Sequence, residues 1–217
     1  MAKMIRNSLL LVIALVSLCL LPQAEAANGR GYVHPNDFYC YQIKLGDSEL
    51  VLEQVFGKEM YNKSDSLGGI TVTTHYYPGD IAISVAPRTG KIVDIVIKGK
   101  DFRMRDDVAI GATSYWLTKV FGKTPRVQLD AATCYIYQHP TKPHEHLVFT
   151  VSAQEGTLEG IRITALPLSD EEAQQMAGQP ETAALFGADL EPEKIAAKDI
   201  DTSSVTSDKP IRLGGMF

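Results

Sequence analysis

Apolar and polar positions follow the same pattern twice along this chain, about 65 residues apart. Residues 45–58 read LGDSELVLEQVFGK, and residues 110–123 read IGATSYWLTKVFGK, with six of the 14 aligned positions identical. Farther along, residues 81–98 align with residues 147–164 at an offset of 66. The pattern therefore predicts one structural unit that occurs twice.

Each copy begins with a predicted amphipathic helix. Ser48 or Asp47 can cap the first helix and Thr113 the second, through a side-chain oxygen. Gly57 and Gly122 follow the helices, where a left-handed residue ends a helix at little steric cost. The apolar positions have helical spacing and fall on one stripe of each helix; they are Val51, Leu52, Val55 and Phe56 in the first copy, and Trp116, Leu117, Val120 and Phe121 in the second.

The rest of each copy alternates with period two, which predicts β-strands with one buried face. Residues 70–77 and 134–139 are each predicted as a first strand, rich in β-branched and aromatic side chains. Gly90 and Gly156 mark the turns of the hairpins that follow. The hairpin positions match pairwise; they are Ile81, Ile83, Val85, Ile92, Ile95 and Ile97 in the first copy, and Leu147, Phe149, Val151, Leu158, Ile161 and Ile163 in the second. The three-residue step from Ile92 to Ile95 and from Leu158 to Ile161 suggests a shared bulge or a later strand start.

The predicted fold class is α+β, with two tandem units of a helix plus a three-stranded antiparallel sheet. The first unit covers residues 38–99 and the second residues 106–166, with residues 100–105 as a linker. A short helix on a one-sided sheet buries both apolar faces, so each unit can form a small core.

The repeated motif resembles the units of the β-lactamase-inhibitor-protein-like superfamily, whose other branch is the small outer-membrane assembly lipoproteins of the SmpA/OmlA type. The resemblance covers about 130 of the 217 residues. It implies two sheets set side by side as a concave binding surface, and a binding or assembly role. The matching positions are Leu45, Gly46, Ser48, Leu52, Phe56, Gly57, Ile110, Gly111, Thr113, Leu117, Phe121, Gly122 and Pro125.

The first 26 residues have the three parts of a secretory signal peptide. Lys3 and Arg6 are followed by an apolar run over residues 9–21, then by Pro22 and the small residues of Ala24-Glu25-Ala26. This order predicts cleavage after Ala26. The run is too short to span a bilayer, which takes about 20 residues. We therefore expect a periplasmic or secreted protein with no transmembrane segment in the mature chain.

The charge is distributed unevenly along the chain. Residues 168–217 carry ten acidic and four basic residues, whereas residues 27–167 are balanced. A neutral body gives no reason to expect a nucleic-acid partner, because phosphate binding needs clustered Lys and Arg. In the tail, Ser169 and Glu172 predict a short helix over residues 168–178. The acidic, Pro-containing remainder is expected to be disordered or to form loosely held helical turns, and its apolar end PIRLGGMF is either a docking peptide or a frayed terminus.

Cys40 and Cys134 are the cysteines that remain after the signal peptide. In an oxidising compartment an even pair favours a disulfide, and we expect these two to form one. The alternative is two separately buried thiols. Neither residue lies in a motif of a catalytic thiol.

Three histidines are the candidates for metal chemistry. His139, His144 and His146 lie with Glu145 in QHPTKPHEHL, and imidazole is a common ligand of zinc and copper. The order is not HExxH, and two prolines favour a solvated loop between strands. We therefore expect no metal and no cofactor, and an enzyme that uses this loop is the alternative.

Binding agrees better with the sequence than catalysis does, because no nucleophile has a recognisable setting. Aromatic side chains on a sheet surface are frequent contact residues; the candidates are His75, Tyr76, Tyr77, Tyr135 and Tyr137. We expect a non-catalytic module of the bacterial cell envelope that recognises a protein or an envelope component through its sheet. Its oligomeric state is left open.

Overall fold

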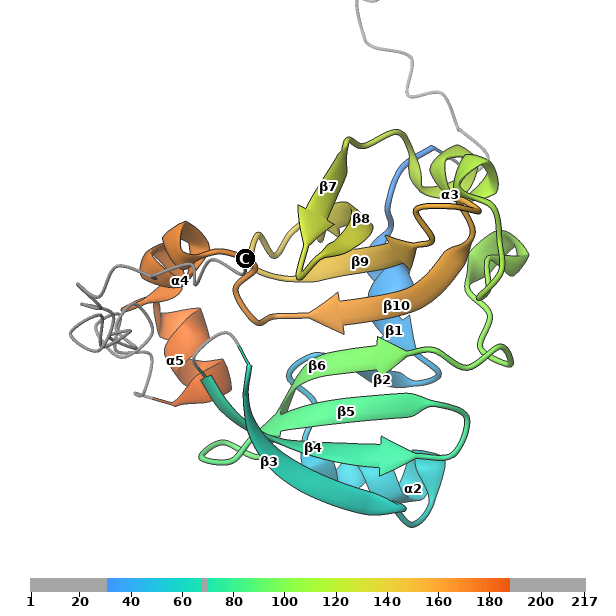
Figure 1. The fold of residues 1–217 in the computed structure, drawn as a ribbon. Helices are drawn as coiled ribbons and strands as arrows, with labels where there is room; N and C mark the ends of the chain where they lie inside the picture. The colour runs from blue at the N-terminus through green and yellow to red at the C-terminus, as the bar shows by residue number, and fades with distance from the viewer. Residues whose placement is uncertain (1–30, 68–69, 188–217) are drawn as a thin grey trace, which may run out of the picture. The chain divides into compact units, whose positions relative to one another are not determined.

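Eight strands, four from each copy of the motif, form a single antiparallel sheet (Figure 1). The computed structural model describes residues 31–67 and 70–187. The order of the strands across the sheet is β3-β4-β5-β6-β10-β9-β8-β7. Their bounds are β3 (Tyr61–Leu67), β4 (Ile70–Tyr77), β5 (Ile81–Ala86), β6 (Lys91–Ile97), β7 (Arg126–Leu129), β8 (Ala132–Gln138), β9 (His146–Val151) and β10 (Leu158–Thr164).

The two copies join where β6 pairs with β10. Ile95 lies opposite Ile163, and Ile97 lies opposite Ile161. Because Ile95 corresponds to Ile161 and Ile97 to Ile163 in the sequence repeat, the antiparallel pair relates the copies by a local twofold arrangement. The last strand of each copy thus pairs with the last strand of the other copy.

Two apolar rows cross the sheet through this junction. The register places six side chains of each row on successive strands from β4 to β8. The first row is Tyr77, Ile81, Ile97, Ile161, Phe149 and Tyr135, and the second is His75, Ile83, Ile95, Ile163, Leu147 and Tyr137. All but His75 are buried, so the apolar core is continuous from one copy to the other.

Main-chain hydrogen bonds show the repeat in detail. The Gly46 amide donates to the Ile92 carbonyl and the Gly111 amide to the Leu158 carbonyl, both at 2.8 Å. Isolated bridges join Ser48 to Lys91 and Thr113 to Thr157. The register shifts at the expected place in both hairpins, between Ser84 and Val85 in one and between Leu158 and Gly160 in the other.

The helices cover the apolar face. In the first copy a 3-10 turn, η2 (Glu49–Val51), leads into α2 (Leu52–Phe56), and in the second the helix is α3 (Ser114–Phe121). Ser48 and Thr113 cap them, accepting hydrogen bonds from Leu50 and Trp116 amides. Gly57 and Gly122 end them with φ of 74° and 96°, a backbone region that favours glycine. Leu52 and Leu117 are buried against the core.

An N-terminal arm packs on the same core. It consists of η1 (Pro35–Phe38), β1 (Tyr39–Cys40) and β2 (Ile43–Lys44), and β1 pairs with β2 as a two-stranded sheet. Phe38, Ile43 and Leu45 belong to the apolar core. In Figure 1 the arm lies behind β6 and β10, so it covers the junction of the two copies.

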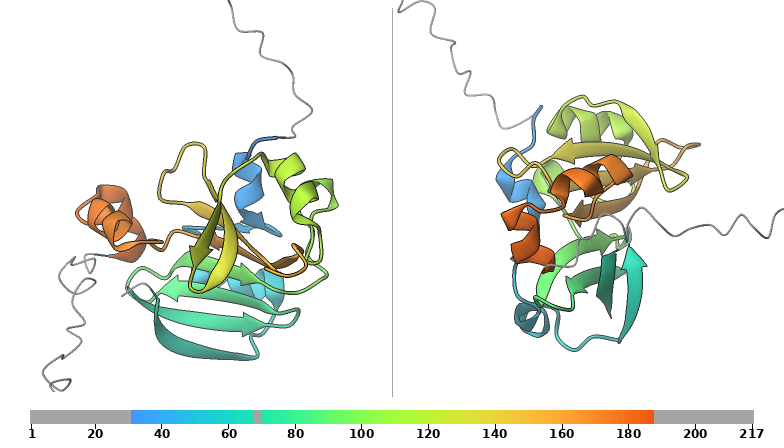
Figure 2. Two further views of the ribbon diagram at one scale, coloured as in Figure 1. Left: turned by 45° about the horizontal axis from the view of Figure 1, so that its top comes forward. Right: turned by 90° about the vertical axis from the view of Figure 1, so that its left-hand side faces the viewer.

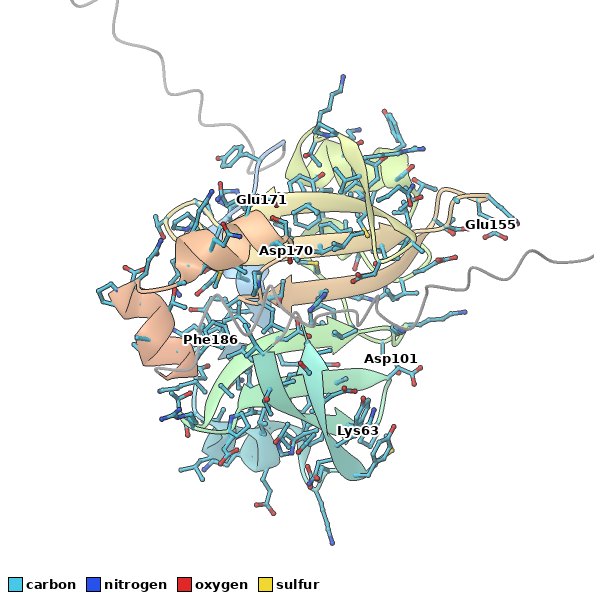
Figure 3. The ribbon with its side chains drawn as sticks, turned by 60° about the vertical axis from the view of Figure 1, so that its left-hand side comes forward. Lys63, Asp101, Glu155, Asp170, Glu171 and Phe186 are labelled. Atoms are coloured by element: carbon cyan, nitrogen blue, oxygen red, sulfur yellow. The ribbon has the colours of Figure 1, made fainter. Side chains whose placement is uncertain are left out.

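The expected fold class was wrong in two respects. Each copy has four strands rather than three, and the two sheets merge into one instead of forming separate units. The missed strands are β3 and β7, the two edges of the sheet. Their polar side chains are almost all exposed on both faces, so they lack apolar alternation; Lys63 of β3, labelled in Figure 3, has 63% of its side chain exposed. The sheets merge because unpaired β6 and β10 would each expose apolar rows and backbone hydrogen-bonding groups.

After the sheet come two helices, α4 (Asp170–Met176) and α5 (Pro180–Phe186), which lie together at one end of the strands (Figure 2). Ser169 caps α4, accepting a hydrogen bond from the Glu172 amide at 3.2 Å. The second helix is firmer than expected, because residues 180–186 were predicted as disorder or loosely held helical turns; Phe186 and Thr182 anchor it by burial. The expected signal peptide over residues 1–26 and the terminal PIRLGGMF lie outside the described residues.

One ion pair at the junction distinguishes the two copies. Arg162 Nε of β10 donates to Asp94 Oδ1 of β6 at 2.6 Å. The equivalent positions are Gly160 for Asp94 and Val96 for Arg162, so each copy supplies one partner. Burial raises the pKa of the Asp94 carboxyl, and Arg162 and Thr164 lower it in part. The cost of removing the two charges from water offsets much of their attraction, so a buried pair of this kind adds little net stability.

This pair gives a first prediction. Arg162→Ala leaves the Asp94 carboxyl buried without its cation and should lower the free energy of unfolding by about 3–5 kcal/mol. The double variant Asp94→Leu with Arg162→Met should lose much less, because neither charge is then buried. Urea unfolding of the three proteins measures both values. Equal losses in the single and double variants would show that the pair does not act as a unit.

Candidate functional site

Three of the five side chains expected on a binding surface are in the core. Tyr77, Tyr135 and Tyr137 are 3%, 5% and 7% exposed, because they lie in the apolar rows beneath the helices. Tyr137 donates its hydroxyl proton to the Gly122 carbonyl at 2.7 Å, and the Tyr135 hydroxyl accepts from Arg126 at 2.7 Å. Burial raises the pKa of the Tyr137 phenol. Tyr137 thus holds the end of α3 in place, and Tyr135 holds the edge strand β7. All three tyrosines point into the core and not toward a partner.

The other two lie at the rim of the first copy. Tyr76 is on the face opposite Tyr77, and its ring stacks on the exposed Tyr61 ring with centroids 4.4 Å apart. His75 has 17% of its side chain exposed and bonds the Glu59 carboxylate through Nδ1. That bond lowers the pKa of Glu59. Only Tyr76 is thus placed for contact, and the five candidates do not form one surface.

The two cysteines are free thiols, so the expected disulfide does not form. Cys40 belongs to the apolar core on the helix side of the sheet. Cys134 follows the opposite alternation from the core residue Tyr135 and contacts Thr150 of β9, its Sγ 3.7 Å from the hydroxyl. The sheet therefore lies between the thiols. Burial raises the pKa of Cys40 to about 12 and also raises that of Cys134, which makes either a poor nucleophile.

The three histidines of the β8–β9 loop do not converge. His139 packs edge-on against Phe38, with ring centroids 4.5 Å apart, and its Nδ1 accepts from the Thr141 amide. His144 and His146 instead approach Glu172 of α4, with His146 Nε2 2.5 Å from Glu172 Oε1. Among the residues that the structure describes, no group of three or more His, Cys, Asp or Glu side chains is arranged so that it could hold a metal ion.

The surface best suited to a partner was not among those predicted from the sequence. It is an aromatic groove of about 680 Å³ between the N-terminal arm and the segment before η3 (Arg105–Asp107). We call it the arm groove; its lining residues are His34, Pro35, Asn36, Asp37, Tyr39, Tyr41, Phe102, Arg103, Met104 and Arg105. Tyr39 and Tyr41 are 37% and 53% exposed, and Tyr32, whose ring contacts that of the lining residue His34, is 47% exposed.

Tyr41 is held in position by its backbone and its neighbours. It follows β1 in the tight turn to β2 with φ of 55°, where glycine is the favoured residue. Such a conformation costs about 1–3 kcal/mol for a bulky side chain. Its ring meets Phe56 and Phe102 edge-on, with centroids 5.6 Å and 5.4 Å apart, and each such contact returns about 0.5–1.5 kcal/mol. The ring is therefore both exposed and fixed.

Arg105 makes the floor of the arm groove rigid. Its Nε donates to Oδ1 of the buried Asp37 at 2.8 Å, and its Nη2 donates to the carbonyls of Tyr32 and Val120. The guanidinium lies 4.8 Å from the centre of the Phe121 ring. One side chain thus ties the arm to α3. Arg103 at the rim has 60% of its side chain exposed.

The sequence held one signal for this surface. Residues 32–41 read YVHPNDFYCY, with three tyrosines within ten residues and no alternation that would bury them. No expected helix or strand covered residues 32–41, so these tyrosines received no role.

Comparisons with known proteins give little beyond this geometry. No family model matches the chain, and no curated protein matches it. Among solved structures, a cysteine-rich secretory protein of Staphylococcus aureus matches with 12% identity and a TM-score of 0.42, covering 62% of this chain and 49% of its own. An extracellular protein of Bacillus anthracis that contains an SCP domain matches with 14% identity and a TM-score of 0.35, covering 65% and 52%.

The expected membership in the β-lactamase-inhibitor-protein-like superfamily was wrong: no family model or curated protein of that superfamily matches the chain, and the two solved structures named above carry other descriptions. This chain spans about half the length of each of them, and TM-scores this low carry no argument about its activity. Export of this chain therefore stays a prediction. Cleavage after Ala26 and the choice between periplasm and secretion stay predictions. In the described part of the chain, no helix has both the length and the apolar character needed to span a bilayer.

The Glu59–His75 bond predicts a dependence of stability on pH. Because the pKa of Glu59 is lowered in the folded protein, the contribution is present above the ordinary range of Glu, near pH 4, and is lost as pH falls through the lowered value. Glu59→Gln should therefore lower Tm at pH 7, and the difference from wild type should shrink toward acid pH. Glu159→Gln, an exposed acid on β10, is the control. A constant difference at all pH values would contradict this assignment.

The thiols give a separate prediction. The intact mass of protein purified from its export compartment should be the same before and after reduction, and maleimide should modify Cys40 and Cys134 only after unfolding. A mass gain of two hydrogens on reduction would instead show that the two cysteines form a disulfide.

Proposed function

We propose that this chain is an exported, non-catalytic binding module that holds a segment of another protein in the arm groove. The observation that carries the proposal is the set of exposed tyrosines gathered at one rigid groove. Tyr and Arg dominate interface hot spots because they present a large contact area at little entropic cost. Tyr39, Tyr41 and Arg103 provide these side chain types within the arm groove.

Two further features support the arm groove over the sheet. Three of the four candidate tyrosines of the sheet are occupied by core packing, so they are not available to a partner. The arm groove is preformed by the Tyr41 ring contacts and by Arg105, which reduces the entropy that binding would cost.

Catalysis has weaker support. The thiols have raised pKa values and are buried, and the histidines of the β8–β9 loop are divided between two places. The cell-envelope setting of the partner rests on the N-terminal sequence.

Site-specific photo-crosslinking in the producing cells tests the proposal. A photoreactive aromatic amino acid replaces Tyr39, and the matched control places it at Tyr115, which is 73% exposed on α3. The Tyr39 position should form covalent adducts with a defined polypeptide, and the Tyr115 position should not. Adding Tyr41→Ala should reduce the adduct about tenfold or more, the effect of losing a hot-spot side chain. Identical adducts from both positions, or an adduct yield that Tyr41→Ala does not change, would contradict the assignment of the arm groove as the binding site.

A further inference from the structure

Two histidines and one carboxylate meet between the β8–β9 loop and α4. His146 Nε2 lies 2.5 Å and His144 Nδ1 lies 3.9 Å from the same atom, Glu172 Oε1. The three side chains are 10%, 19% and 17% exposed, so they are largely shielded from solvent. The loop and the helix are thus joined by atoms that are all good metal ligands.

The tautomer of His144 follows from its neighbours. Gln179 donates its amide hydrogen from Nε2 to the Gln175 carbonyl at 2.6 Å, which leaves Gln179 Oε1 as an acceptor. His144 Nε2 lies 3.0 Å from that oxygen and must therefore carry the hydrogen. In the neutral ring, Nδ1 is then an unprotonated nitrogen.

That nitrogen has a buried lone pair that faces a carboxylate. Within the described residues His144 Nδ1 has no hydrogen-bond partner, and the distance of 3.9 Å to Glu172 Oε1 is too long for a hydrogen bond. A lone pair beside a carboxylate oxygen is unfavourable, and either a proton on the ring nitrogen or a metal cation between the two atoms removes the repulsion. His146, itself 8% exposed, also has a buried Nδ1 without a partner in the described part.

The carboxylate is oriented from the opposite side. Glu172 Oε2 accepts a hydrogen bond from the Leu168 amide at 2.8 Å, so Oε1 is the oxygen that faces the histidines. Gln179 orients the His144 ring in the same way, through its hydrogen bond to Nε2. Supporting hydrogen bonds of this kind commonly orient the ligands of metal sites.

We propose that His144 Nδ1, His146 Nε2 and Glu172 Oε1 bind one divalent transition-metal ion, with Zn²⁺ as the best fit. Two imidazoles and a carboxylate leave one position of a tetrahedron for water. Ligand bonds of about 2.0–2.2 Å place the donor atoms about 3.3 Å apart. The 2.5 Å distance must then open and the 3.9 Å distance close, each by less than 1 Å. In the structure His146 and Glu172 share a hydrogen bond instead.

A cavity beside the cluster gives the ion an approach. It measures about 410 Å³, and His144 lines it together with Met176 of α4 and Thr182 of α5. An ion bound here links the β8–β9 loop to α4, and it therefore fixes the C-terminal helices on the sheet. Figure 3 labels Asp170 and Glu171 at the start of α4 and Phe186 at the end of α5.

Calorimetric titration of the untagged, chelator-treated protein with ZnCl₂ at pH 7 tests the proposal. One Zn²⁺ should bind per chain and raise Tm, because the ion binds the folded state. Glu172→Gln and His146→Asn should each weaken binding at least about tenfold, and Gln179→Ala about 10–100-fold, as loss of a supporting hydrogen bond does. Circular dichroism checks that each variant is folded. His139→Ala is the matched control from the same loop and should bind like wild type.

Gln179→Ala removes no ligand and keeps the test decisive if a ligand variant does not fold. The Co²⁺ complex of wild type should show the visible absorption of a four-coordinate ion, and this absorption should be lost in the variants that lose Zn²⁺. Absence of Zn²⁺ binding by wild type, or binding unchanged in Gln179→Ala and in every folded ligand variant, overturns the site. Weaker Zn²⁺ binding in His139→Ala alone would also overturn the site.

Discussion

The pairing of β6 with β10 is the constraint on which the rest of this structure depends. Each copy of the motif ends in a strand rich in isoleucine, and neither strand can remain at a sheet edge without exposing that apolar surface and its backbone groups. Pairing them buries Ile95 and Ile97 against Ile163 and Ile161 and makes one core of two. The Asp94–Arg162 pair crosses this junction, with one charge supplied by each copy.

This joint core determines which side chains remain for function. Apolar rows that run from β4 to β8 require Tyr77, Tyr135 and Tyr137 to point beneath the helices. The arm covers the junction and brings its own tyrosines to the surface, fixed by Arg105 and by the contacts of Tyr41. The polypeptide after β10 returns over the end of the sheet, where α4 meets the histidines of the β8–β9 loop. Both proposed sites therefore lie where an added segment packs on the duplicated sheet.

The sequence predicted the local elements better than their assembly. The alternation of Ile81, Ile83 and Val85, the capping residues Ser48 and Thr113, and the bulge in each hairpin all follow from short-range rules, and each is present. The edge strands β3 and β7 could not be predicted from apolar period, because both of their faces are solvated. The prediction of a disulfide failed for a related reason: the number of residues between two cysteines does not show on which face of a sheet each thiol lies. The candidate site was missed because tyrosines on a short arm lack a pattern, and Glu172 is distant in sequence from the histidines that it contacts.

Native-state hydrogen exchange tests the central claim, that the two copies form one cooperative sheet. If they do, the amides of β6 and β10 are the slowest to exchange, and strands of both copies share one free energy of opening, equal to that of global unfolding. Two separate sets of opening free energies, one for residues 43–97 and one for residues 111–164, would contradict it, because each copy would then fold without the other.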